Sequence, residues 1–269
     1  MSVGVTRAVV PMRVPSGCCG LGDAVRMEWI KLCSLRSSWL VLALTLVATV
    51  GIGVAVGATA TDAHGDLTNN ALAGVVPGLL LTGGLGVLTM TGEYSSGTIR
   101  STLAAMPRRS LVLTAKVVVF GLATLLVGEV AAFIAFFADA AALGHGIVAP
   151  TLGQADVLRA VVATGAGFAL VGLFGLGIGA ILRHTGAALG VLVAGVYVIA
   201  QPVGILVHGV AAYMPLLIVE NSLSTTKPVS CGEETCPHFL SAWGGLGVLG
   251  LWAAVALAIG GVLFARRDA

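Results

Sequence analysis

Six apolar runs, each about twenty residues or longer, constrain the fold of this 269-residue chain more than any other feature. The runs are residues 39–60, 71–91, 114–138, 157–182, 186–208 and 240–265. A helix needs about 20 apolar residues to cross a bilayer, and within lipid the backbone must satisfy its own hydrogen bonds. The pattern therefore predicts an all-α integral membrane protein with six transmembrane helices.

The composition agrees with a membrane protein. Only 10% of the residues are charged, against about 25% in a typical soluble domain, and 57% are hydrophobic. The chain also has 38 glycines, which let membrane helices approach closely. Gly165, Gly172 and Gly179, spaced by seven, predict a packing face on the fourth helix.

The distribution of basic residues predicts the orientation. Twelve of the 14 Lys and Arg residues flank one set of helix ends, and only Arg159 and Lys227 flank the other. Because cytoplasmic loops carry the excess of Lys and Arg, we expect a multi-pass protein of the cell membrane with both termini cytoplasmic. The loops on the outer side are acidic and include Asp66, Asp139 and Asp156.

The segment before the first apolar run divides into two parts. Residues 1–22 show no periodicity and predict a flexible cytoplasmic N-terminus. Residues 23–38 place apolar side chains on one helical stripe, which predicts an amphipathic helix at the membrane surface. The candidate site residues on this helix are Arg26, Glu28, Trp29, Lys31 and Arg36. The run 39–60 has no cleavage site at its end, so we expect a retained helix, not a signal peptide.

A polar island, residues 92–110, separates the second and third apolar runs. Ser95 or Ser96 can cap a helix start, and Pro107 cannot continue a helix. The interval from Gly97 to Met106 has room for two to three turns. The island therefore predicts a short ordered helix at the membrane face, where a simple linker would need no such order.

These two segments carry a resemblance to a known family. Arg-x-Glu-Trp-x-Lys leads into the first span, and Gly-Glu-Tyr-Ser-Ser-Gly-Thr-Ile-Arg follows the second, before Pro-Arg-Arg-Ser and Lys116. Over residues 25–269 the pattern resembles the permease subunits of type 2 ATP-binding cassette (ABC) exporters. The resemblance implies that residues 39–269 form a six-span transmembrane domain, and that 211–219 is a short segment on the outer side.

The resemblance also implies roles for individual residues. The amphipathic helix would be the connecting helix, and the segment from Glu93 to Met106 would be the coupling helix that docks on a separate ATPase. The coupling residues would be Glu93, Tyr94, Ser95, Ser96, Gly97, Thr98, Ile99 and Arg100, with Ile99 on the docking face. Glu93 would lie near a basic residue of the connecting helix, with Arg26 or Arg36 as the candidates. The family works as a dimer, here with a second permease copy or a paralogue.

The chain has no Gly-x-x-x-x-Gly-Lys-Ser/Thr loop and no soluble region large enough for a nucleotide-binding fold. We therefore expect two copies of an ABC ATPase subunit as partners, with ATP and Mg bound there and no cofactor on this chain. The chain would not be an enzyme by itself. Its histidines are scattered singly, which predicts no metal site, and no basic surface with interleaved aromatics indicates a nucleic-acid partner.

Two polar residues within the spans are candidates for a substrate pathway. An ionised Glu129 would cost about 2.5–3.5 kcal/mol in the membrane, so it needs a partner, a wet cavity or a proton. Gln201 precedes a helix-breaking proline. A pathway role and a structural hydrogen bond stay open for Glu129, and a packing kink stays open at Gln201.

Cys231 and Cys236 share the last outer loop, where four intervening residues allow the turn that a disulfide needs. Metal binding with His238 is the alternative, although it offers too few ligands for a closed zinc site.

The expected function is export of an apolar or amphiphilic substrate, such as a drug, peptide or lipid. Two alternatives remain: an ion-coupled carrier or membrane-embedded enzyme that uses Glu129, and a non-transporting immunity or assembly factor.

Overall fold

The computed structural model describes residues 20–59, 66–144, 147–199, 202–203, 206, 210, 212–225 and 240–266. All regular secondary structure in these ranges is helical, which confirms the all-α prediction. In chain order the elements are α1 (Leu21–Ser34), α2 (Arg36–Ala58), α3 (Leu67–Ala71), α4 (Val75–Ser95), α5 (Thr98–Ala105), α6 (Arg109–Ala142), α7 (Ala155–Leu182), α8 (Thr185–Val193), the π-helix η1 (Ala194–Val198), α11 (Pro215–Leu223) and α12 (Ala242–Arg266).

Five helices, α2, α4, α6, α7 and α12, are long and apolar enough to cross a membrane. They coincide with five of the six predicted spans and indicate a multi-pass membrane protein. Within the predicted span 186–208, the continuous helix among the described residues comprises the 9 residues of α8 and the 5 of η1. Further along the chain the described residues 202, 203, 206 and 210 are also helical, and the Val203 N–H donates to the Ile199 carbonyl at 3.1 Å. A sixth full span stays a prediction.

Contacts at the two ends of α7 show the course of the chain after it. Just past α7, Arg183 donates a hydrogen bond to the Leu263 carbonyl, near the end of α12, at 3.2 Å. Near the start of α7, Arg159 donates to the carbonyls of Ser222 and Ser224 at 3.3 and 3.0 Å. The chain between α7 and the end of α11 therefore passes from one end of the helix bundle to the other.

Helix α7 lies at the centre of the bundle, in contact with α4, α6, α8, α11 and α12. Glycines allow its close approach to α4: a methyl group added at Gly175 would overlap the Gly83 carbonyl, and one at Gly86 would overlap the Gly172 carbonyl. Two helix backbones can come this close only where side chains are absent. Of the three glycines predicted to form one packing face, Gly179 lies against α4, whereas Gly165 and Gly172 face Glu129 and Phe120 of α6, so their close contacts are divided between two helices.

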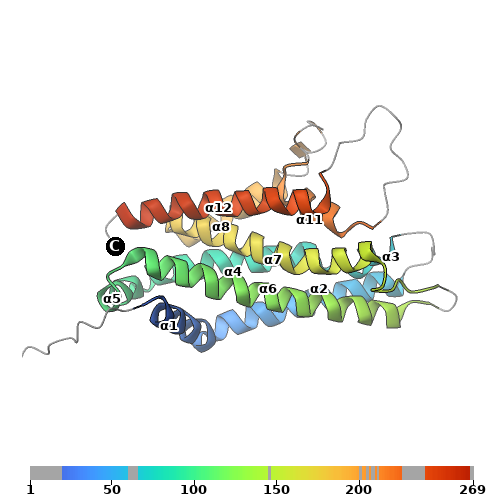
Figure 1. The fold of residues 1–269 in the computed structure, drawn as a ribbon, viewed down its shortest axis with the longest axis horizontal. Helices are drawn as coiled ribbons and strands as arrows, with labels where there is room; N and C mark the ends of the chain where they lie inside the picture. Colours follow the sequence, from blue (N-terminus) through green and yellow to red (C-terminus); the bar gives the residue numbers. More distant parts are fainter. Residues whose placement is uncertain are drawn as a thin grey trace, which may run out of the picture.

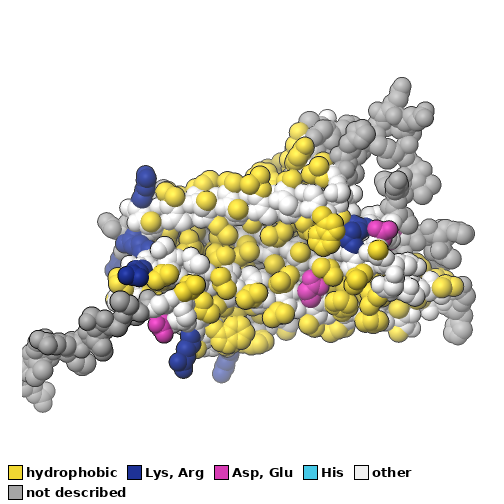
Figure 2. Space-filling model, in the orientation of Figure 1, with side chains coloured by type: hydrophobic (Ala, Val, Ile, Leu, Met, Phe, Trp, Pro, Cys, Tyr) yellow, Lys and Arg dark blue, Asp and Glu magenta, His cyan; other side chains and the backbone are white. Residues whose placement is uncertain are grey.

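The surface of the bundle divides into an apolar middle and polar ends. Hydrophobic side chains cover the middle of the face seen in Figure 2, and Lys and Arg gather at the end where α1 and α5 lie. At the opposite end, Arg159 Nε lies 3.5 Å from Asp156 Oδ1. This polarity is typical of a membrane protein whose α5 end faces the cytoplasm, although the orientation itself stays a prediction.

Two helix boundaries differ from the sequence-based expectation in ways that shape the site. An elbow at Leu35, in extended conformation, separates α1 from α2 inside the range 23–38 expected to form one helix. Trp39 Nε1 donates to the Cys33 carbonyl at 3.0 Å and so bridges this elbow. Helix α4 continues to Ser95, past the expected end at residue 91, so Glu93 lies in a helical turn. Residues 1–19 lie outside the described part.

Candidate functional site

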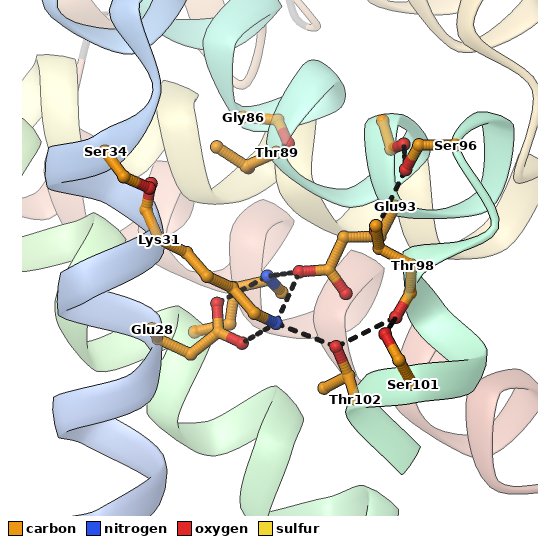
Figure 3. Close-up of polar contacts among 12 residues, drawn as sticks. Glu28, Lys31, Ser34, Gly86, Thr89, Glu93, Ser96, Thr98, Ser101 and Thr102 are labelled. Carbon is orange, nitrogen blue, oxygen red and sulfur yellow. Dashed lines mark hydrogen bonds and ion pairs between the residues drawn. The ribbon is translucent and has the colours of Figure 1, made fainter. Parts of the chain in front are cut away.

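Four charged side chains from three helices meet at the α5 end of the bundle (Figure 3). We call them the ion-pair cluster: Glu28 and Lys31 of α1, Glu93 of α4 and Lys116 of α6. Lys116 Nζ lies 2.6 Å from Glu28 Oε2 and 2.7 Å from Glu93 Oε1. Lys31 Nζ lies 2.9 Å from Glu28 Oε1 and 3.0 Å from Glu93 Oε1. Each lysine therefore bridges the same two carboxylates.

The short helix α5 is tied to this cluster by a hydroxyl group. Lys31 Nζ donates to Thr102 Oγ1 at 3.0 Å, and the Thr102 hydroxyl donates to the Thr98 carbonyl at 3.1 Å. Figure 3 shows the continuous path from Lys31 through Thr102 to Thr98. As a result α1, α4, α5 and α6 are connected through one set of polar contacts.

The cluster is buried and electrically balanced. Glu28, Lys116 and Glu93 are 4%, 5% and 9% exposed, whereas the Lys31 side chain keeps 29% of its surface exposed. Two carboxylates and two ammonium groups sum to zero charge. Burying a charge is costly unless it is paired and hydrogen-bonded, so removal of any one member leaves a neighbour uncompensated.

The partners of Glu93 differ from those expected. The resemblance pointed to Arg26 or Arg36, but both side chains are exposed, and Glu93 pairs instead with Lys31 of α1 and with Lys116 of α6. The reason is the rotation of α1 about its axis. Ala24 and Glu28 lie on the side that is buried against the bundle, whereas Trp29 lies on the outer side and is 51% exposed. Lys31 lies one turn from Glu28 and shares its side of the helix.

Helix α5 spans Thr98–Ala105 and ends before Pro107, where the sequence predicted a short helix. Its N-cap, however, is Gly97 and not Ser95 or Ser96. Gly97 has a positive φ of 71°, a conformation that glycine adopts without strain. The Ser96 hydroxyl instead donates to the Gly92 carbonyl at 2.7 Å, inside the last turn of α4. The sharp turn at Gly97 thus sets the direction of α5.

One side of α5 is buried and the other is exposed. Ile99 is 3% exposed and packs in an apolar cluster with Met90, Ala180 and Phe264. The expectation that Ile99 lies on a docking face is therefore wrong, because this side chain belongs to the core. The exposed side carries small and basic residues, namely Thr98, Arg100, Ser101 and Ala104.

Tyr94 connects the end of α4 with the end of α12. The Arg183 guanidinium carbon lies 4.9 Å from the centroid of the Tyr94 ring, a cation–π contact. Arg183 also donates to the Leu263 carbonyl, and Arg109 donates to the Phe264 carbonyl at 3.1 Å. The last carbonyls of a helix lack intrahelical partners, so these two arginines satisfy groups that end α12.

A cavity of about 550 Å³ lies beside the ion-pair cluster, between α1, the start of α2, α4 and α6. Its apolar wall is formed by Leu32, Leu35, Leu88, Val119 and Phe120. All four members of the ion-pair cluster also line it, together with several hydroxyl groups. This size and this mixture of surfaces suit a small ligand, since such sites are mostly apolar cavities of about 300–1,000 Å³ with a few polar groups.

Glu129, a candidate pathway residue, lies partly buried in α6. Its Oε2 is buried and has no hydrogen-bond partner among the described residues. A methyl group added at Gly165 of α7 would overlap the Glu129 carboxyl group, so the missing side chain at this glycine makes room for it.

Asp139, expected in an outer loop, lies in the last turns of α6 at 1% exposure and fills the space beside Gly57 of α2.

The remaining candidates are settled only in part. Gln201, Cys231 and Cys236 lie outside the described residues, so the pathway and disulfide hypotheses for them stay predictions. Cys33 is a free thiol. Within the described ranges no group of His, Cys, Asp and Glu side chains could hold a metal ion.

Sequence reasoning missed Lys116 and Thr102 as partners in this site. A signal for Lys116 was available: a lysine at the start of an apolar helix requires an anionic partner when it is buried. Glu28 gave a similar signal, because a carboxylate beside the apolar stripe of the amphipathic helix requires a cationic partner when it is buried. No comparable pattern marks Thr102, because threonine is common on helix surfaces.

Comparison with known proteins identifies no family for this chain. No protein-family model matches the chain, and no curated protein matches it.

Proposed function

We propose that this chain is the permease subunit of an ATP-driven exporter, with α5 as the element on which a separate ATPase subunit acts. The observation that carries this proposal is the attachment of α5 to the bundle through Lys31, Thr102 and the ion-pair cluster. A connection between two spans needs no such attachment if it only joins them. A surface that another protein pushes does need it.

The contacts of α5 supply a route for such a push. Displacement of α5 would act on α1 through the Thr102–Lys31 hydrogen bond, and on α4 and α6 through the ion pairs of Lys31 and Lys116. Ile99, which shares an apolar cluster with Phe264, would carry the displacement to the end of α12. Coupling over such distances requires a packed, polar-linked element with two arrangements, and these contacts are suited to that role.

The wider proposal follows the resemblance stated above. Two such permease chains, each with six spans, would pair in the cell membrane with both termini cytoplasmic, and two ATPase copies would supply ATP and Mg. An apolar or amphiphilic substrate fits the scarcity of polar groups in the spans.

Substitution on the exposed side of α5 tests this proposal. Ala104→Asp adds a charge to the proposed docking face without touching the core, since Ala104 is exposed. We expect the variant to insert normally, to lose co-purification of a subunit with ATPase activity, and to lose ATP-dependent efflux. The control is Ala155→Asp, the same change at an exposed position at the other end of the bundle. Equal ATPase binding and efflux in both variants would refute a docking role for α5.

A second candidate function is an ion-coupled carrier, favoured by Glu129 Oε2 in α6, which is buried and has no hydrogen-bond partner in the described part of the chain. A carboxyl group within a span that lacks a fixed partner is suited to exchanging a proton or a cation. In that case Glu129→Gln would abolish transport driven by a proton gradient in vesicles free of ATP, and Ala104→Asp would leave this transport intact. Transport that requires ATP, that Ala104→Asp abolishes and that Glu129→Gln leaves intact supports the exporter.

A further inference from the structure

We infer that the cavity between α1, α2, α4 and α6 binds one amphiphile with a zwitterionic head group, the head against the ion-pair cluster and the chain leaving between Leu35 and Leu88. The inference goes beyond the proposed function, because it needs only the membrane location of the bundle and not an ATPase partner.

The lining of the cavity changes from polar to apolar along the axis of the bundle. Glu93 and Lys116 lie at its α5 end, and one turn further into the bundle the same helices contribute Leu88, Val119 and Phe120 to its wall. A ligand that fills it must therefore carry a polar group at one end and an apolar group at the other. If the α5 end faces the cytoplasm, this is the orientation of a lipid in the inner leaflet.

The exposed part of the cavity lining, which we call its mouth, contains two leucines beside several hydroxyl residues. Leu35 and Leu88 line the cavity and are also 51% and 40% exposed, respectively. An acyl or alkyl chain can lie against both side chains while the head group occupies the interior. The ligand could thus enter from the bilayer without leaving its apolar surroundings.

The charges select the head group. Because the cluster holds two carboxylates and two ammonium groups, a head with net charge would be attracted by one pair and repelled by the other. A zwitterion meets both: its ammonium group can lie beside the Glu93 side chain, which lines the cavity and is 11% exposed, and its anionic group can accept from Lys31. Lys31 is suited to this contact because its side chain keeps 29% exposure.

Native mass spectrometry of the purified, delipidated full chain tests the inference. The probes are phosphatidylethanolamine, which is zwitterionic, and phosphatidylglycerol, which is anionic, with identical acyl chains. We expect one retained phosphatidylethanolamine per chain, with an apparent Kd about tenfold or more below that of phosphatidylglycerol, equivalent to about 1.4 kcal/mol. Equal or tighter retention of phosphatidylglycerol would overturn the inference.

Two variants locate the binding. Leu88→Trp and Leu35→Trp each fill the mouth from a different helix, and both should raise the apparent Kd at least tenfold. Leu251→Trp makes the same change on α12, at a side chain 62% exposed and outside the cavity lining, and should leave it unchanged. If both mouth variants retain phosphatidylethanolamine like the control, the cavity is not the site.

In the native preparation, a lipid that co-purifies at one per chain identifies a resident lipid, whereas an empty site that fills on addition identifies a passing amphiphile.

Discussion

Lys116 shows how strongly one residue can depend on its partners. Its ammonium group is almost fully buried in α6 and is held there by Glu28 and Glu93, which come from two other helices. A buried ion pair contributes little net stability compared with apolar residues of the same size, but a broken pair is strongly destabilising. The cluster is therefore sensitive to single substitutions and tolerant of compensated ones.

Replacement of Lys116 by Met should lower the free energy of unfolding by about 3–5 kcal/mol, because two buried carboxylates lose one of the two cations that they share, and one negative charge is left uncompensated. The measurement is a denaturant titration in detergent, with exposed Arg26→Ala as the control, for which we expect a change within about 0.5 kcal/mol. Adding Glu93→Gln to Lys116→Met should recover part of the loss, since one uncompensated charge disappears. A Lys116→Met protein as stable as Arg26→Ala would contradict the burial of the cluster.

Of the helix pairs described above, α4 and α7 have the closest backbone contact. Glycines at the contact allow the two backbones to approach. A side chain at Gly86 or Gly175 would meet the backbone of the opposite helix, which cannot move without displacing the whole element. The same two helices connect the site to the core, because α4 also carries Glu93 and Tyr94. Their packing therefore sets the position of the ion-pair cluster.

Gly86→Ala should destabilise the protein by about 1–3 kcal/mol, the usual cost of forcing extra volume into a packed core. The matched control is Gly51→Ala in α2, where a methyl group would have no neighbour within 4 Å. Alanine is the better helix former, so this control should be neutral or stabilising by up to about 1 kcal/mol. The two variants are compared by thermal unfolding of the purified protein, and a stable Gly86→Ala variant would show that the helices are further apart.

For the whole molecule, the gathering of Lys and Arg at the α5 end predicts the orientation in the membrane. Ser101 in α5 and Thr151 in the connection between α6 and α7 are exposed, and these two elements of the chain lie at opposite ends of the bundle (Figure 1), so both positions suit cysteine labelling in a variant without native cysteines. A membrane-impermeant maleimide should label Thr151→Cys in intact cells and Ser101→Cys only after permeabilisation, because the basic end faces the cytoplasm. Labelling of both positions from the same side would rule out this topology.

The sequence by itself determined the class of the protein and the position of its long helices, because apolar runs of about twenty residues have one stable arrangement in lipid. It also predicted the short helix that ends before Pro107, since proline is a local constraint. Only the tertiary structure decided which cations meet Glu93, that Ile99 is buried, and that a cavity adjoins the cluster. Lys31 and Glu93 are 62 positions apart, and Glu28 and Lys116 are 88 positions apart. Such contacts depend on how each helix is rotated and how closely its neighbours pack, which the pattern along the chain does not encode.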